Sequence, residues 1–271
     1  MKKNSLIFVV IAALFAACSS SDNEPSPDAG STPDVSPQDI AITSDLPQDV
    51  VQVEDIKVYP DLPPLPDLPV KAPCESEWTD AINPQTKVST GEVKTQNLSG
   101  GVFQTTVDAK AGGMNQSVNN PYVYVSFKDG SHVDINDLEA KTSTEWDMAF
   151  KRAVIRVNGG DSGPGQGAIA IVANKTLDQV TSLPANASFA ADNFLDENCK
   201  ILRDPINNVL TAIGGQTGLW YDYDSSSMKV SPKPDTYLVR RADGSVIKLV
   251  IDSYYNTAGA GGFYTLRWSP L

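Results

Sequence analysis

A proline- and acid-rich segment near the N-terminus confines any hydrophobic core to the later part of the chain. Eleven of the 19 prolines lie between Pro25 and Pro73, and residues 19–73 carry 11 acidic residues against two lysines. Proline removes backbone donors and like charges repel, so we expect residues 18–73 to be an extended linker. A spacer is favoured, and a proline-rich ligand for a recognition module is the alternative. The fold must come from residues 74–271, which are numerous enough for a sizeable core.

Residues 1–17 are typical of an export signal. Lys2 and Lys3 precede an apolar run that is too short to span a bilayer. The run ends in Leu-Phe-Ala-Ala-Cys at residues 14–18, which resembles a bacterial lipobox with Cys18 as the lipidated residue. Ser19 follows the cysteine, and by resemblance to Gram-negative lipoproteins this favours the outer membrane, on a side that the sequence does not determine. An ordinary signal peptide that happens to contain a cysteine is the alternative.

Residues 74–271 contain short apolar or alternating runs separated by turn residues. This pattern predicts a mainly β domain, rich in antiparallel sheet, with few short helices. The expected strands are residues 122–127, 132–136, 153–158, 168–173, 237–239, 246–251 and 262–268. The only helical patterns are residues 176–180 and 206–213, and both are short.

Composition excludes several functions. The net charge of −12 argues against nucleic acid binding. The chain has a single histidine, and no pairing of a base with a nucleophile and no metal-ligand cluster is visible, so we do not expect an enzyme or a metal site. The run Gly-Asp-Ser-Gly at 160–163 resembles a serine protease signature but lacks its histidine context, and a glycine-rich loop is favoured. Acidic residues at 134–139 lack EF-hand spacing and predict a solvated turn.

The cysteines predict a disulfide. With Cys18 lipidated, Cys74 and Cys199 remain in an exported, oxidising environment. A bridge across this separation is worth about 4–5 kcal/mol in the chain-entropy model. Two separate thiols are the alternative.

The residues around Trp220 are the strongest candidates for ligand binding. Tyr221, Tyr223 and Met228 follow it closely, and such rings and a thioether could line a flat hydrophobic pocket or could belong to the core. The only histidine, His132, shares a strand face with polar neighbours in an alternating pattern, so we expect it to face solvent. A metal ligand is the alternative for His132.

Two blocks of sequence resemble the HmuY family of haem-binding outer-membrane lipoproteins. The first includes Tyr-Val-Tyr-Val-Ser-Phe at 122–127, Trp-Asp-Met-Ala-Phe at 146–150 and Asn-Gly-Gly-Asp-Ser-Gly at 158–163. The second includes Tyr-Leu-Val-Arg-Arg-Ala-Asp-Gly at 237–244 and Gly-Phe-Tyr-Thr-Leu at 262–266. The resemblance covers about residues 119–271, with a weak stretch at 189–216.

The resemblance implies a mostly β domain behind a lipidated N-terminus and a role in haem capture. Its best-known members hold iron with two histidines, but the second of these positions falls near Ser225 and the middle region has no histidine. Related members use methionine, which makes Met228 the leading candidate, with Tyr221 and Tyr223 as ring contacts or a phenolate ligand and His132 as a remote second choice. The partner is then haem or a haem-carrying protein. The alternative function is a binding or adhesion module of the same fold that recognises another ligand or a protein.

Overall fold

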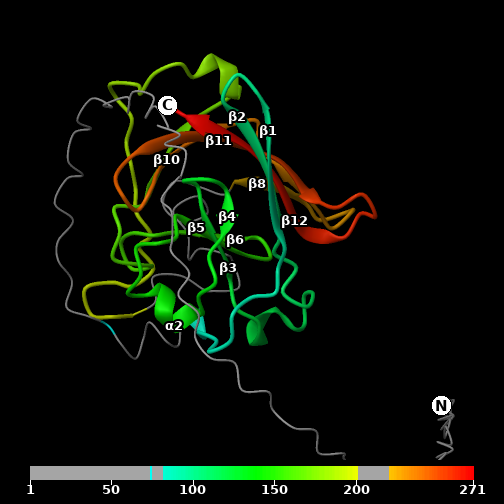
Figure 1. Ribbon diagram of the computed structural model, residues 1–271. Helices are drawn as coiled ribbons and strands as arrows, with labels where there is room; N and C mark the ends of the chain where they lie inside the picture. Colours follow the sequence, from blue (N-terminus) through cyan, green and yellow to red (C-terminus); the bar gives the residue numbers. More distant parts are fainter. Residues whose placement is uncertain (1–73, 75–81, 201–219) are drawn as a thin grey trace, which may run out of the picture. The chain divides into compact units, whose positions relative to one another are not determined.

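The largest element of the structure is a six-stranded antiparallel sheet. The structure is a computed structural model that describes residue 74, residues 82–200 and residues 220–271 (Figure 1). The strands are ordered β1-β2-β12-β11-β10-β7, and every neighbouring pair is antiparallel. Their bounds are β1 Val93–Ser99, β2 Val102–Asp108, β7 Ala168–Val172, β10 Thr236–Arg240, β11 Val246–Tyr255 and β12 Gly261–Pro270.

A smaller sheet and a separate hairpin complete the strands. The smaller sheet has the order β4-β3-β5-β6, and β8 and β9 form a two-stranded hairpin. The bounds are β3 Val123–Ser126, β4 Ser131–His132, β5 Met148–Lys151, β6 Val154–Val157, β8 Tyr221–Asp224 and β9 Lys229–Pro232. The described helical segments are α2 Asp137–Ala140 and the 3₁₀ turns η1 Ser117–Asn119 and η2 Leu177–Gln179. The predicted mainly β, antiparallel architecture with few short helices is confirmed.

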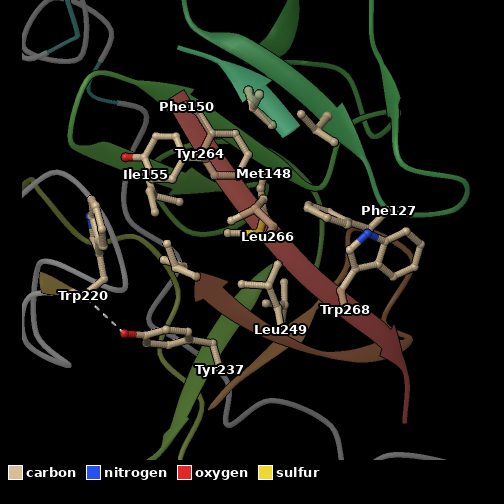
Figure 2. Close-up of a cluster of buried hydrophobic side chains, with 14 of the residues drawn as sticks. Phe127, Met148, Phe150, Ile155, Trp220, Tyr237, Leu249, Tyr264, Leu266 and Trp268 are labelled. Atoms are coloured by element: carbon tan, nitrogen blue, oxygen red, sulfur yellow. Dashed lines mark hydrogen bonds between the residues drawn. The ribbon is translucent and has the colours of Figure 1, made fainter. Parts of the chain in front are cut away.

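The main core lies between the two larger sheets. Because side chains alternate along a strand, β5 directs Met148 and Phe150 to this core. The six-stranded sheet contributes Leu249, Leu266 and Trp268 from the other side, and Figure 2 shows these side chains meeting.

The opposite face of the smaller sheet is also buried. Tyr124 and Ala149 pack there with Trp146 and with residues from the segment after β7. A strand buried on both faces needs apolar residues at every position, which explains why residues 122–127 form a run with little alternation. A disulfide joins Cys74 to Cys199 beside this second cluster, with Cα atoms 5.3 Å apart, and this is the pairing expected from the sequence.

Most predicted strands correspond to observed ones, but the strand expected at residues 132–136 is wrong, because β4 ends at His132. Residues 122–127, 168–173 and 262–268 correspond to β3, β7 and β12, and the two runs around the Asp-Gly turn at 243–244 are β10 and β11. The predicted helix at 176–180 is the 3₁₀ turn η2, and residues 206–213 lie outside the described residues. The sequence pattern did not predict β1, β2, β5, β8 and β9. For β1 and β2 the reason is that most of their side chains are polar or exposed.

The solvated turn expected at residues 134–139 is wrong in part, because the segment holds a short helix and one buried carboxylate, although Asp134 and Glu139 are exposed. Asn136 caps the short helix α2 by accepting from two backbone N–H groups, and Glu139 completes the capping box. Asp137 is fully buried and accepts hydrogen bonds from the backbone N–H of Gln85 and Tyr122, at 3.0 Å each, and from the hydroxyl of Tyr124 at 2.9 Å. These partners are remote in sequence, so a local pattern gives no sign that the carboxylate is buried.

Candidate functional site

Three of the four predicted ligand-binding residues lie on the hairpin β8–β9. Tyr221 and Tyr223 are two positions apart on β8 and therefore share a face, opposite Pro232 and Val230 of β9. Tyr221 is buried, whereas Tyr223 is 56% exposed. Met228 is 76% exposed in the turn that joins the two strands. The hairpin therefore runs from a buried aromatic base to an exposed tip that holds a phenol ring and a thioether.

The tip is ordered by Asp224. Its carboxylate accepts hydrogen bonds from the hydroxyls of Ser227 at 2.6 Å and Ser226 at 2.7 Å, and from the backbone N–H of Ser226 at 2.9 Å. These hydrogen bonds, that of Ser227 first, lower the pKa of Asp224 to about 2. Met228 then adopts a positive φ of 53°, which turns the chain back into β9. The Met228 side chain projects from a turn whose shape depends on other residues.

The base of the hairpin is an aromatic cluster. The Trp220 ring lies 4.8 Å from Tyr221, 5.7 Å from Tyr254 and 5.3 Å from Tyr264, measured between ring centroids. Figure 2 shows Trp220 among the core side chains, in line with its complete burial. Burial also raises the pKa of Tyr254 and Tyr264, so these two hydroxyls stay neutral and do not supply a phenolate.

Hydrogen bonds fix the hairpin to the rest of the domain. The backbone N–H of Val230 donates to the Tyr255 hydroxyl at 2.8 Å, and β9 runs beside β11 (Figure 1). The indole N–H of Trp220 donates to the carbonyl of Ala153 at 2.9 Å, in the turn between β5 and β6. Both larger sheets therefore position the hairpin.

His132 is not part of this group. It lies on β4, which pairs with β3 in the smaller sheet. Its side chain is only 22% exposed, Nδ1 lies 3.0 Å from a carboxylate oxygen of Asp134, and Nε2 is buried without a hydrogen-bond partner. The expectation that His132 faces solvent is therefore wrong in part, because one ring edge is buried.

The Trp-Asp and Asn-Gly-Gly motifs form internal hydrogen bonds and not a binding surface. Asp147 is buried and accepts from the backbone N–H groups of Phe127 at 2.6 Å and Ala242 at 2.9 Å. Asn158 is also buried and donates to the carbonyl of Trp146 at 2.8 Å. These residues connect strands that are distant in sequence, so their role is to hold the fold together.

The protease-like serine has a structural role as well. The buried Ser162 hydroxyl lies 2.5 Å from a carboxylate oxygen of Asp192 and accepts from Nε of Arg156 at 3.0 Å. The neighbouring Asp161 accepts from the backbone N–H of Phe194 at 2.9 Å. The glycine-rich loop expected here is present between β6 and β7.

Other candidate sites are few in the described part of the chain. A cleft of about 180 Å³ lies between residues 87–91 and 108–112, and the hairpin does not line it. Within residue 74 and residues 82–200 and 220–271, no three His, Cys, Asp or Glu side chains gather as a metal site would require. No helix in these ranges is long and apolar enough to cross a membrane.

The fold and the hairpin define a mainly β protein with an exposed aromatic and thioether tip, and comparison with known proteins gives its family. The family model described as "HmuY protein" matches residues 119–268. This match spans more than half of the chain, and the protein belongs to the HmuY family. A search of curated proteins found no match.

The solved structures that are similar to this chain include three from different bacteria. A "putative lipoprotein" from Bacteroides fragilis is 18% identical, with a TM-score of 0.44, over 65% of this chain and 94% of its own. A "putative HmuY_like heme binding protein" from Bacteroides vulgatus is 18% identical, with a TM-score of 0.44, over 66% of this chain and 97% of its own. The "Apo HmuY analog" from Tannerella forsythia is 15% identical, with a TM-score of 0.41, over 68% of this chain and 99% of its own.

Proposed function

We propose that this protein is a lipid-anchored envelope protein that captures haem, or a related flat aromatic ligand, at the tip of the hairpin β8–β9. The observation that supports this most directly is the exposure of Tyr223 and Met228 above the buried cluster around Trp220. A porphyrin presents a large apolar face, and an exposed ring and a polarisable thioether suit such a face. Membership of the HmuY family supports the same ligand.

The donor atoms fit a methionine-ligated site and not one with two imidazoles. A single histidine cannot supply both axial ligands, and His132 lies on the other sheet with Nε2 buried. Met228 is the leading iron ligand, Tyr223 and Tyr221 are ring contacts or, as a second choice, phenolate donors, and His132 remains a remote second candidate. Thioether ligation favours ferrous over ferric iron, so haem binding should tighten on reduction.

A haemin titration tests this proposal. The Soret band is followed with oxidised haemin and after reduction with dithionite, for the wild type, Met228→Ala and Met114→Ala. Met114 is a matched control, because it is 79% exposed and precedes η1, far from β8–β9 in the sequence. Ferrous affinity should fall about tenfold or more in Met228→Ala and stay unchanged in Met114→Ala. Equal titrations in all three proteins would remove Met228 from the site.

The anchor is proposed at Cys18, after a signal of residues 1–17. Cys18 and the linker together form residues 18–73, which lead to the β domain of residues 74–271. The motif around Cys18 supports it. Metabolic labelling with a clickable fatty acid should mark the wild type, and Cys18→Ala should leave the membrane fraction. A mutant that stays in the membrane fraction would contradict the lipid anchor.

A non-haem binding or adhesion role is the second candidate. The absence of the family's two histidines from the sequence favours it, because the exposed tip residues would equally suit a protein surface or another aromatic ligand. The absence of a Soret shift in both redox states would leave this role in place of haem capture.

A further inference from the structure

Arg152 occupies a position where an arginine is conformationally unfavourable. It begins the two-residue turn between β5 and β6 and has a φ of +52°. Glycine or asparagine adopts this conformation at less cost, so a long cationic side chain here needs another explanation. The backbone is held from two sides: its N–H donates to the Ala109 carbonyl at 2.8 Å, and its carbonyl accepts from the Tyr264 hydroxyl at 2.7 Å. The domain therefore fixes where this side chain starts.

The guanidinium lies at the edge of the aromatic cluster. Its Nη1 donates to the Gly261 carbonyl at 2.7 Å, and Gly261 pairs with Tyr255 between β11 and β12. A Cβ placed on Gly261 would lie 2.9 Å from the Tyr254 ring and 3.3 Å from the Tyr255 ring, so both rings are immediate neighbours. The positive charge of Arg152 also acts to lower the pKa of Tyr254, against the larger effect of burial. Arg152 is thus next to the residues that support the hairpin β8–β9.

The charge of Arg152 is not neutralised within the described part of the domain. Of its five N–H donors, the structure assigns one to Gly261, and no ion pair with a described carboxylate is formed. The side chain is half-buried, and none of its nitrogens is an enclosed, unpaired atom, so the remaining donors face solvent. The nearby Lys110 differs, because Asp108 lies 2.9 Å from its ammonium group. Arg152 is therefore a cation beside the aromatic cluster that has no ion pair with a described carboxylate.

We infer that Arg152 selects ligands that carry a carboxylate beside the aromatic face. A guanidinium presents parallel N–H donors that match the two oxygens of a carboxylate, and such charge-assisted pairs are stronger than neutral hydrogen bonds. The ligand class is then a flat aromatic molecule with acidic side chains, and haem with its two propionates is one member. This inference rests on the proposed function, since it assigns a specificity residue to the base of the same hairpin, beside Gly261 and the rings of Tyr254 and Tyr255.

The test compares haemin with its dimethyl ester, which has the same ring and iron but no carboxylates. The wild type should bind the diacid about tenfold or more tightly than the diester. Arg152→Asn, which tolerates a positive φ, should lose this preference and keep its affinity for the diester. Arg241→Asn is the matched control, because Arg241 is paired with Asp243 in the β10–β11 turn, and it should keep the preference.

The outcomes separate the two claims. Equal binding of both porphyrins by the wild type, or an unchanged preference in Arg152→Asn, would overturn the role of Arg152 while haem capture stands. If neither porphyrin binds the wild type, the proposed function and the role of Arg152 fail together. Circular dichroism checks that Arg152→Asn is folded. If this variant does not fold, Arg152→Gly takes its place in the test, because glycine removes the side chain and tolerates a positive φ.

Discussion

Replacing Lys151 with methionine should stabilise the domain at neutral pH. Lys151 ends β5 on the face of the smaller sheet that bears the second cluster, and it is only 9% exposed. Its ammonium nitrogen lies 4.2 Å from the centre of the Tyr122 ring. Burial lowers the pKa of Lys151 from its usual 10.5 to about 8, while Asp137 raises it and Arg156 lowers it by smaller amounts. Methionine keeps an unbranched apolar stem and removes the charge.

The size of the effect follows from linkage. Between pH 8 and 10.5 the unfolded chain keeps the proton that the folded domain has released, so stability rises with pH in this window. Below pH 8 the folded domain bears the whole cost of the buried charge. The pKa difference between 10.5 and about 8 corresponds to about 3 kcal/mol, because each pKa unit is worth about 1.4 kcal/mol. Losing the contact between the ammonium and the ring costs about 1 kcal/mol. A net gain of about 2 kcal/mol is expected at pH 7 for Lys151→Met, and it should vanish near pH 10.5.

Urea unfolding followed by tryptophan fluorescence at several pH values measures this difference. The quantity of interest is the stability of Lys151→Met minus that of the wild type, because the titration of other groups cancels in it. Lys128→Met is the matched control, since Lys128 is exposed beyond the end of β3, and it should change stability little at any pH. A difference for Lys151→Met that is the same at pH 7 and pH 10, or a variant less stable than the wild type at pH 7, would refute the reasoning.

Three further predictions concern the scaffold. Asp147→Asn should lower the free energy of unfolding by about 2 kcal/mol in urea titrations. The amide N–H₂ would replace one carboxylate oxygen and would face a backbone N–H donor, either that of Phe127 or that of Ala242. An unchanged free energy of unfolding would contradict the role of this carboxylate. Replacing Cys74 and Cys199 by serine should cost about 3–5 kcal/mol, and an unchanged thermal midpoint would show that the bridge is dispensable. Tyr255→Phe should cost about 1 kcal/mol and speed hydrogen exchange at the Val230 amide, and unchanged exchange there would contradict the hydrogen bond.

Strands with a clear apolar signal were predictable from the sequence, and residues held by remote partners were not. β3 is an apolar run because both of its faces are buried, and buried residues alternate along most of β12, so pattern alone locates them. Asp137 looks like part of a polar turn, yet its three donors come from remote positions that no local window contains. The hairpin residues Tyr221 and Tyr223 were predicted together. The sequence did not show that Tyr221 is buried against Trp220 while Tyr223 is exposed.

Arg152 shows the same limit for the candidate site. Its neighbours in sequence give no sign of a binding role, because its position depends on Tyr264 and Gly261, more than a hundred residues away. Only the backbone conformation, a positive φ at a non-glycine residue, draws attention to it once the structure is known. A signal of this kind does not exist in a single sequence.

The separation between scaffold and tip explains how the chain can belong to the HmuY family without the histidines that its best-known members use. The motif residues Asp147, Asn158 and Ser162 are buried and bond to the interior of the domain, so changing them would cost folding free energy. Tyr223 and Met228 are exposed at a turn whose shape depends on Asp224 and its serine partners. Substitutions of these exposed side chains therefore cost the fold little, so under the proposed function the ligand could change while the scaffold stays the same.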